Sequence, residues 1–256
     1  MSVYAKIRVE VTPPHARITL AHPPQNVLDL VLMDELAAAL AEIEPRSDVV
    51  TLTIAGSEKV FSAGVDVAAH TPDKVRDMLT KFHGVIRALV ASRKVTIASV
   101  RGNCLGGGAE LALVCDLVYT SDDATWQFPE IKLGCFPPVA AVALAALVGQ
   151  KRASELILTA RKIAGPEAAA LGLANGVAAG EDVENLVHDA CERLAQLSPA
   201  ALRVTKKALY AWDAMHFDKG LARAEQIYFD ELMKTADAVE GINAFLEKRK
   251  PVWKGT

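Results

Sequence analysis

The sequence has few cysteines, and none lies in a pattern typical of disulfide-rich or zinc-binding proteins. Its 256 residues contain four cysteines, with no C-x-x-C pair and no histidines near them at zinc spacing. We therefore expect neither a disulfide framework nor a metal site, and interpret the thiols as reduced and mostly buried. The cysteines are Cys104, Cys115, Cys135 and Cys191.

The chain also lacks an excess of basic residues. It carries 28 Lys and Arg against 31 Asp and Glu, a formal net charge of −3. A surface that binds nucleic acid normally needs a basic excess gathered on one face. The charge balance therefore argues against nucleic acid as a partner.

No segment combines the length and continuity of a membrane span. The stretch 133–150 carries no formal charge over 18 residues, the lower edge of spanning length, but Pro137 and Pro138 interrupt it. We predict a buried core helix that begins at Pro138. The N-terminal "MSVYAKIRVEV" has no apolar signal core, so we expect a cytoplasmic location and no membrane partner.

Hydrophobic periodicity predicts an α/β core followed by helices. Aromatic residues make up only 5% of the chain, so small aliphatic side chains should fill the core. Alternation predicts a β-hairpin over 6–22 and strands at 49–57, 95–100, 116–121 and 123–128, with helices at 27–44 and 72–92. After residue 139 we expect almost only helix, with breaks near 149 and 175–176 and a new start at 165–166. A boundary at "LSPA" predicts a core carrying the active site over 1–198 and a helical C-terminal region over 199–256.

Three consecutive glycines, Gly106 to Gly108, precede a predicted helix that carries Glu110 in its first turn. Glycine inside a helix costs about 1 kcal/mol relative to alanine, so another requirement should explain them. The spacing fits no phosphate-binding loop. Close backbone packing is one explanation, and on the residues alone the favoured one. The other explanation is that exposed amides at the helix N-terminus bind an anion. Such a site usually needs a second donor, and the loop "FSAGVD" at 61–66 is the candidate for it.

Four motifs in order resemble the crotonase, or enoyl-CoA hydratase/isomerase, superfamily. They are "FSAGVDV" at 61–67, "GNCLGGGAELALVCDLVY" at 102–119, "FPEIKLG" at 128–134 and "GINAFLEKRKPVW" at 241–253. The resemblance implies an α/β fold with a crotonase-type ββα spiral core and a helical C-terminal trimerisation region. It implies an acyl-CoA thioester substrate, a homotrimer or dimer of trimers, and no cofactor, since CoA is part of the substrate.

The resemblance also implies roles for particular residues. The amides of Val65 and Gly107 would form an oxyanion hole for the thioester oxygen. Val65, Asp66, Val67 and Ala68, together with Gly107, would contact the CoA-bearing substrate. Lys206, Lys207, Lys248 and Arg249 are candidates for the CoA phosphates, with a solvated surface as the alternative, and His70 and His83 are interpreted as polar surface.

Glu110 and Glu130 match the two catalytic glutamates of the family's hydratases. The resemblance implies that Glu110 mainly activates water and Glu130 mainly delivers a proton. Two carboxyl groups in one site repel when both ionise, so one should keep its proton at neutral pH. Without the resemblance, Glu110 is explained by the helix dipole and Glu130 by a surface loop.

One segment departs from the hydratase pattern. After "KLG" the chain reads "CFPPVAAVALAAL", where Pro138 replaces a glycine whose amide would lie near the catalytic water. The variant resembles the family's cyclohexa-1,5-diene-1-carbonyl-CoA hydratases, which act in anaerobic breakdown of aromatic compounds. We therefore predict a hydratase, with a cyclic dienoyl thioester as the specific hypothesis for its substrate. The alternatives are a double-bond isomerase, an RNA-binding module, which one hydratase relative exemplifies, and an inactive scaffold.

Overall fold

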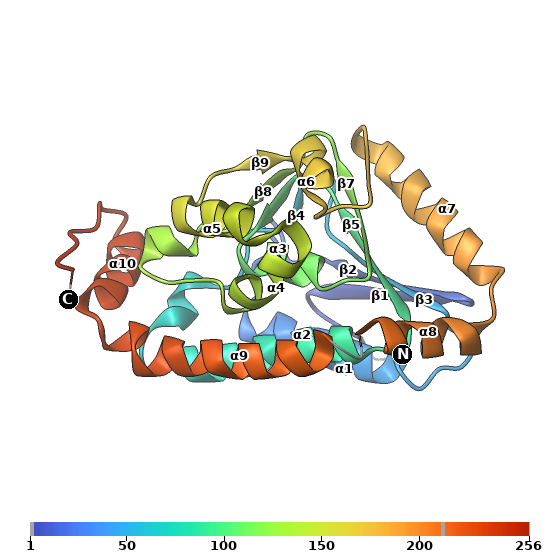
Figure 1. Ribbon diagram of the computed structural model, residues 1–256, viewed down its shortest axis with the longest axis horizontal. Coiled ribbons are helices and arrows are strands. Elements are labelled where there is room, and N and C mark those ends of the chain that lie inside the picture. The colour runs from blue at the N-terminus through green and yellow to red at the C-terminus, as the bar shows by residue number, and fades with distance from the viewer. Residues whose placement is uncertain (1–2, 211–212, 256) are drawn as a thin grey trace.

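Two β-sheets and a surrounding layer of helices build the molecule (Figure 1). The computed structural model describes residues 3–210 and 213–255. The strands are β1 (Ile7–Thr12), β2 (His15–Leu20), β3 (Thr51–Ala55), β4 (Val60–Ser62), β5 (Val95–Val100), β6 (Asn103–Leu105), β7 (Leu117–Ser121), β8 (Thr125–Gln127), β9 (Ile163–Ala164) and β10 (Gly176–Ala178). The larger sheet has the order β1-β2-β3-β5-β7-β10, and the smaller one the order β4-β6-β8-β9.

The larger sheet contains the strands that alternation predicts. β1 and β2 form the antiparallel hairpin, and β3, β5 and β7 follow as parallel neighbours. Every residue of β3 is buried, as is typical of a parallel strand covered on both faces, and α7 packs against it. The sheet is therefore mixed, with its single antiparallel pair at the N-terminal edge.

The smaller sheet is built from strands of two or three residues, and most of it is absent from the sequence prediction. Such strands are too short to show alternation, so only β8 was foreseen. The expectation of almost only helix after residue 139 is wrong at β9 and β10. β9 pairs antiparallel with β8, and β10 adds a parallel strand beside β7.

The helices surround these sheets. They are α1 (Leu30–Ile43), α2 (Val75–Ala91), α3 (Gly107–Leu113), α4 (Pro138–Val148), α5 (Gln150–Thr159), α6 (Gly165–Leu171), α7 (Val183–Ala195), α8 (Pro199–Tyr210), α9 (Asp213–Asp230) and α10 (Ala236–Leu246), with short 3₁₀ helices η1 (Val67–His70), η2 (Glu130–Leu133), η3 (Gly180–Asp182) and η4 (Leu232–Lys234). Asp29 caps α1 by accepting a hydrogen bond from the Leu32 amide (2.9 Å). α4 begins at Pro138, as predicted.

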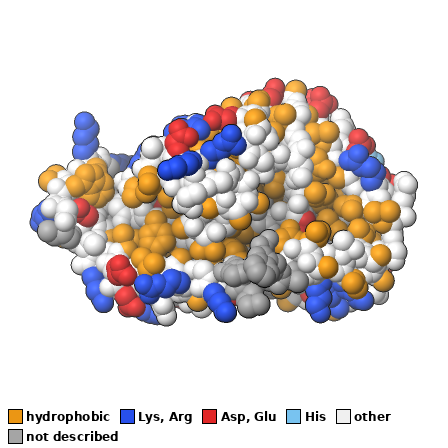
Figure 2. All heavy atoms as spheres, viewed as in Figure 1, with side chains coloured by type: hydrophobic (Ala, Val, Ile, Leu, Met, Phe, Trp, Pro, Cys, Tyr) orange, Lys and Arg blue, Asp and Glu red, His pale blue; other side chains and the backbone are white. Residues whose placement is uncertain are grey.

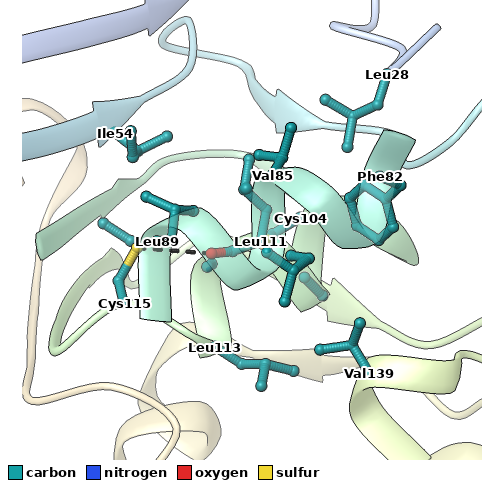
Figure 3. Close-up of a cluster of buried hydrophobic side chains, with 14 of the residues drawn as sticks. Leu28, Ile54, Phe82, Val85, Leu89, Cys104, Leu111, Leu113, Cys115 and Val139 are labelled. Atoms are coloured by element: carbon teal, nitrogen blue, oxygen red, sulfur yellow. Dashed lines mark hydrogen bonds between the residues drawn. The ribbon is translucent and has the colours of Figure 1, made fainter. Parts of the chain in front are cut away.

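The short helix α3 lies at the centre of the core. All seven of its residues are buried. Figure 3 shows Phe82, Val85 and Leu89 of α2 gathered around Leu111 of α3, in a cluster that also includes Val139 of α4. Because packing fixes α3 on every side, the residues at its N-terminus are held in place.

The C-terminal helices pack back onto the core of the same chain. α9 runs along one edge of the molecule against α2 and α4, and α10 contacts η1 and η2 (Figure 1). Lys206 of α8 is buried and pairs with Asp116 (2.6 Å), so it is a structural cation rather than a candidate for binding CoA phosphates. None of the described helices has both the length and the apolar character needed to cross a bilayer.

The packing of α2 yields a stability prediction. Leu89 is fully buried, so Leu89→Ala should lower the free energy of unfolding by about 3 kcal/mol, through lost burial and a residual cavity. Leu158→Ala, the same change at a side chain that is 67% exposed, is the control and should change it by less than about 0.5 kcal/mol. Urea denaturation measures both, and equal effects would contradict this description of the core.

Candidate active site

Two glycine-containing loops meet at the N-terminus of α3, beside β4 and β6 of the smaller sheet. A Cβ placed on Gly107 would lie 2.6 Å from Val65 Cγ2 and 3.4 Å from the Val65 nitrogen. Backbone hydrogen bonds fix the first loop, because the Leu28 amide donates to the Gly64 carbonyl (2.9 Å) and the Asp66 amide to the Leu28 carbonyl (3.2 Å). The N–H groups of Val65 and Gly107 have no hydrogen-bond partner within residues 3–210 and 213–255. The structure therefore brings together two free amides.

At each position of the triplet, a different close contact leaves no room for a side chain. Gly106 adopts a φ of +51°, and its Cβ would lie 2.7 Å from Glu130 Oε1. A Cβ on Gly107 would collide with Val65. A Cβ on Gly108 would lie 2.7 Å from Ser62 Cβ and 2.8 Å from the Ser62 carbonyl oxygen. The triplet thus lets a helix N-terminus approach both the 61–66 loop and a carboxylate.

Glu110 is a buried carboxyl group held by backbone amides. It lies in the first turn of α3, and only 2% of its surface is exposed. Its Oε1 accepts hydrogen bonds from the amides of Val139 and Ala140, both at 2.9 Å. Burial raises the pKa of Glu110 to about 7, while the two amides favour the ionised form and oppose this rise.

Glu130 lines the same cavity, but one of its carboxyl oxygens lacks a hydrogen-bond donor among the described residues. It begins η2, and its Oε2 is buried with no hydrogen-bond partner within the described part of the chain. Burial, and then the charge of Glu110, raise the pKa of Glu130 well above its ordinary value. Because Glu110 has two N–H donors and Glu130 Oε2 has none, the charge belongs on Glu110 and the proton on Glu130.

A cavity of about 430 Å³ is lined by both glutamates and by the two residues that carry the free amides. Its walls are mainly apolar, and they include residues of the C-terminal region as well as of the core. The apolar lining includes Val67, Met78, Leu79, Phe82, Leu105, Leu133, Phe136, Pro137, Pro138 and Phe245. Such a space suits an apolar group attached to a carbonyl that reaches the two amides.

The predicted substrate-binding segment 65–68 is only partly exposed to this cavity. Val65, Val67 and Gly107 line it. Asp66 instead caps η1 by accepting a hydrogen bond from the Ala68 amide (3.0 Å). Neither Asp66 nor Ala68 contributes to the cavity wall, so their contact with substrate stays a prediction.

The interpretation of both histidines as polar surface is wrong for His83, and His70 is half-buried. His83 is fully buried, and its Nδ1 lies 2.6 Å from Glu225 Oε1 of α9. His70 lines the cavity and its Nδ1 lies 3.0 Å from the Asp66 carbonyl oxygen. Burial lowers the pKa of both imidazoles, which favours their neutral forms. The sequence could not reveal this, because it depends on how α9 and α10 pack against the core.

Basic side chains near the cavity are few. Lys132 and Arg249 lie in its wall, and Arg249 also pairs with Glu240 and Glu247. On the face shown in Figure 2, basic and acidic side chains are interspersed and form no stripe of one sign. Among the described residues, no group of three or more His, Cys, Asp and Glu side chains could hold a metal ion.

Comparison with known proteins places the chain among relatives of one family. Residues 15–256 match the family model described as enoyl-CoA hydratase/isomerase. The chain is 35% identical over 240 residues to a cyclohexa-1,5-dienecarbonyl-CoA hydratase from Thauera aromatica, covering 93% of this chain and 92% of that one. It is 37% identical over 254 residues to a probable enoyl-CoA hydratase from Rhizobium meliloti, covering 98% of each. An enoyl-CoA hydratase structure from Mycobacterium avium subsp. paratuberculosis superposes with a TM-score of 0.88 at 27% identity, covering 98% of this chain and 100% of that one.

The glycine triplet yields a second stability prediction. Gly108→Ala should lower the free energy of unfolding by roughly 1–3 kcal/mol, because its Cβ would meet the Ser62 backbone. Gly84→Ala, inside α2 with no atom within 4 Å of the new Cβ, is the matched control and should raise it by up to about 1 kcal/mol. Thermal or urea unfolding compares them, and a neutral Gly108→Ala would contradict the close approach.

The raised pKa of Glu110 predicts a pH-dependent stability. The pKa of Glu110 is about 7 in the folded state, against 4.5 in the unfolded state. Because the folded state binds the proton more tightly, this group contributes its full stabilisation below pH 4.5. The contribution to the free energy of unfolding is lost as the pH rises through 7. Between pH 4.5 and 7, the free energy of unfolding of the wild type should fall by roughly 3 kcal/mol relative to that of Glu110→Gln. Parallel stability curves for the two proteins between pH 4.5 and 8 would contradict the assignment.

Proposed function

The chain belongs to the enoyl-CoA hydratase/isomerase family, and within it we propose that it is a hydratase that adds water to an α,β-unsaturated CoA thioester. The observation that carries this proposal is the asymmetric pair of buried carboxyl groups. Glu110 accepts two amide hydrogen bonds, and the Oε2 of Glu130 accepts none from the described residues. One group is thereby suited to be a base and the other an acid.

The two free amides would bind the thioester oxygen. With the carbonyl oxygen between the N–H groups of Val65 and Gly107, negative charge that develops on it would meet two fixed donors. The N-terminus of α3 adds its partial positive charge at the same point. One such donor typically stabilises a transition state by about 3–4 kcal/mol.

The carboxyl pair would divide the proton transfers of hydration. Ionised Glu110 accepts a proton from water as the water oxygen forms a bond to the β-carbon, and the π electrons move to the thioester oxygen as an enolate. Protonated Glu130 then donates its proton to the α-carbon, and the carbonyl re-forms. Glu110 ends protonated and Glu130 ionised, so one proton must return from Glu110 to Glu130 before the next cycle.

The shape and lining of the cavity support a bulky, apolar acyl group. Phe136, Pro137 and Pro138 form one wall, and neither proline has an N–H that would need a polar partner. A relative that is 35% identical is named as a cyclohexa-1,5-dienecarbonyl-CoA hydratase. We therefore propose a cyclic dienoyl thioester as the preferred substrate, with straight-chain enoyl thioesters as the comparison.

We further expect the chain to work as a trimer or a dimer of trimers. Apolar side chains on α4 and α8 are exposed in the single chain, among them Leu147 (45%), Val204 (60%) and Leu209 (70%). Burying them between subunits would remove this apolar surface from water. The oligomer is the expected form in all the experiments below.

Mass-resolved turnover tests the proposed reaction. With cyclohexa-1,5-diene-1-carbonyl-CoA, the wild type should form a product heavier by one water, and crotonyl-CoA should react more slowly. Glu110→Gln and Glu130→Gln should each lose about 10²–10⁴-fold in kcat, because each removes one proton-transfer group while keeping the shape of the site.

Other outcomes separate the alternatives. A mass-neutral product with a shifted absorbance would replace the hydratase by an isomerase. An absence of water gain on every thioester, or full activity in either glutamine variant, would contradict the proposal. Salt-sensitive RNA binding in a gel-shift assay without turnover would favour a binding module.

A further inference from the structure

A third polar side chain, Tyr228, faces the cavity that holds the two glutamates. It lies near the end of α9, in the C-terminal region, and only 1% of its surface is exposed. It lines the same cavity as Glu110 and Glu130. Its hydroxyl has no hydrogen-bond partner within residues 3–210 and 213–255.

Aromatic packing fixes the ring of Tyr228. The ring centroid lies 5.2 Å from that of Phe136, in a tilted arrangement, and 6.2 Å from that of Phe229, nearly edge-on. The Cys135 sulfur, a weak acceptor, lies beside the hydroxyl and interacts with it without forming a hydrogen bond of ordinary geometry, and the thiol donates instead to the Leu133 carbonyl (3.6 Å). The ring is therefore held in place, and the hydroxyl remains available to a stronger acceptor.

The hydroxyl stays protonated at neutral pH. Burial, the neighbouring Cys135 and the charges of Glu130 and Glu110 all raise the pKa of Tyr228 well above its ordinary value. A protonated phenol can donate one hydrogen bond. Leaving a buried hydroxyl unpaired costs about 1–3 kcal/mol, so a ligand atom that accepts this bond would recover part of that cost.

The unpaired atoms in the cavity complement one another. Tyr228 offers a donor, and Glu130 Oε2 and ionised Glu110 offer groups that exchange protons. The small group that matches all three is an oxygen that both accepts and donates, which describes a water molecule or an alcohol. A carbonyl oxygen could accept hydrogen bonds from Tyr228 and from protonated Glu130, but it has no proton to donate to ionised Glu110.

The backbone at the start of α4 cannot supply this donor. Pro138 has no N–H, and Glu110 accepts both of the amides that follow it, those of Val139 and Ala140. Tyr228 approaches from another helix, beside Phe136 in the segment that precedes Pro138. Its hydroxyl can therefore donate a hydrogen bond to an oxygen atom that receives none from the backbone at the start of α4.

We propose that the Tyr228 hydroxyl donates a hydrogen bond to the oxygen atom that is added to the substrate. It would hold that oxygen as water before attack and as the β-hydroxyl group of the product afterwards, while Glu110 takes the proton. This inference rests on the proposed hydration, and it makes one side chain of the C-terminal region part of the reacting site.

Binding of matched thioesters tests this contact without turnover. The probes are 2-hydroxycyclohexanecarbonyl-CoA with cyclohexanecarbonyl-CoA, and 3-hydroxybutyryl-CoA with butyryl-CoA, titrated calorimetrically into the oligomer. The wild type should bind the hydroxy member of a pair more tightly. Tyr228→Phe should reduce this preference by about 3- to 15-fold, from the loss of one hydrogen bond, with the deoxy thioester bound as before. Tyr119→Phe is the matched control, because Tyr119 packs against Gly176 in the larger sheet, outside the cavity wall.

The outcomes distinguish this inference from the proposed reaction. An unchanged hydroxy-to-deoxy ratio in Tyr228→Phe, for both pairs, would overturn the contact even if the wild type hydrates enoyl thioesters. Equal losses for both members of each pair would also overturn it, because they would show that the ring only shapes the cavity. If the wild type hydrates nothing yet Tyr228→Phe loses the preference, the contact holds and the proposed reaction fails.

Discussion

Two carboxyl groups buried in one apolar cavity cannot both carry a charge, and the site is organised around this constraint. Burial alone would protonate both, and the amides of Val139 and Ala140 stabilise the ionised form of Glu110 only. The asymmetry therefore comes from backbone geometry at the start of α4. It leaves Glu130 as the group that keeps its proton. The two amides thus allow a base and an acid to coexist in the same cavity at neutral pH.

The rest of the fold holds these groups in fixed positions relative to one another. The entirely buried α3 fixes Glu110, and the glycines before it let the helix N-terminus lie against Val65 on one side and Glu130 on the other. The small second sheet matters for the same reason, since β4 and β6 lead into the two loops that supply the free amides. The C-terminal helices then close the cavity with residues from the same chain.

Much of this arrangement could be predicted from the sequence, and the exceptions share a cause. The hairpin, α1, α2 and the start of α4 follow from periodicity and from Pro138, which are local signals. Resemblance to a family marked Glu110, Glu130, Val65 and Gly107, and the structure brings these four to one cavity. The three-residue strands carry no periodic signal. The burial of His83 and Tyr228 depends on where α9 packs, which no local pattern encodes.

The most direct test of this account is a titration of the two carboxyl groups themselves. Infrared difference spectra of protein with ¹³C-labelled glutamate, recorded between pH 4 and 10 and compared with Glu110→Gln and Glu130→Gln, would assign each band. The account predicts that Glu110 ionises near pH 7 and that Glu130 keeps its proton to higher pH. Ionisation of both groups between pH 4 and 5, as for exposed glutamates, would contradict it.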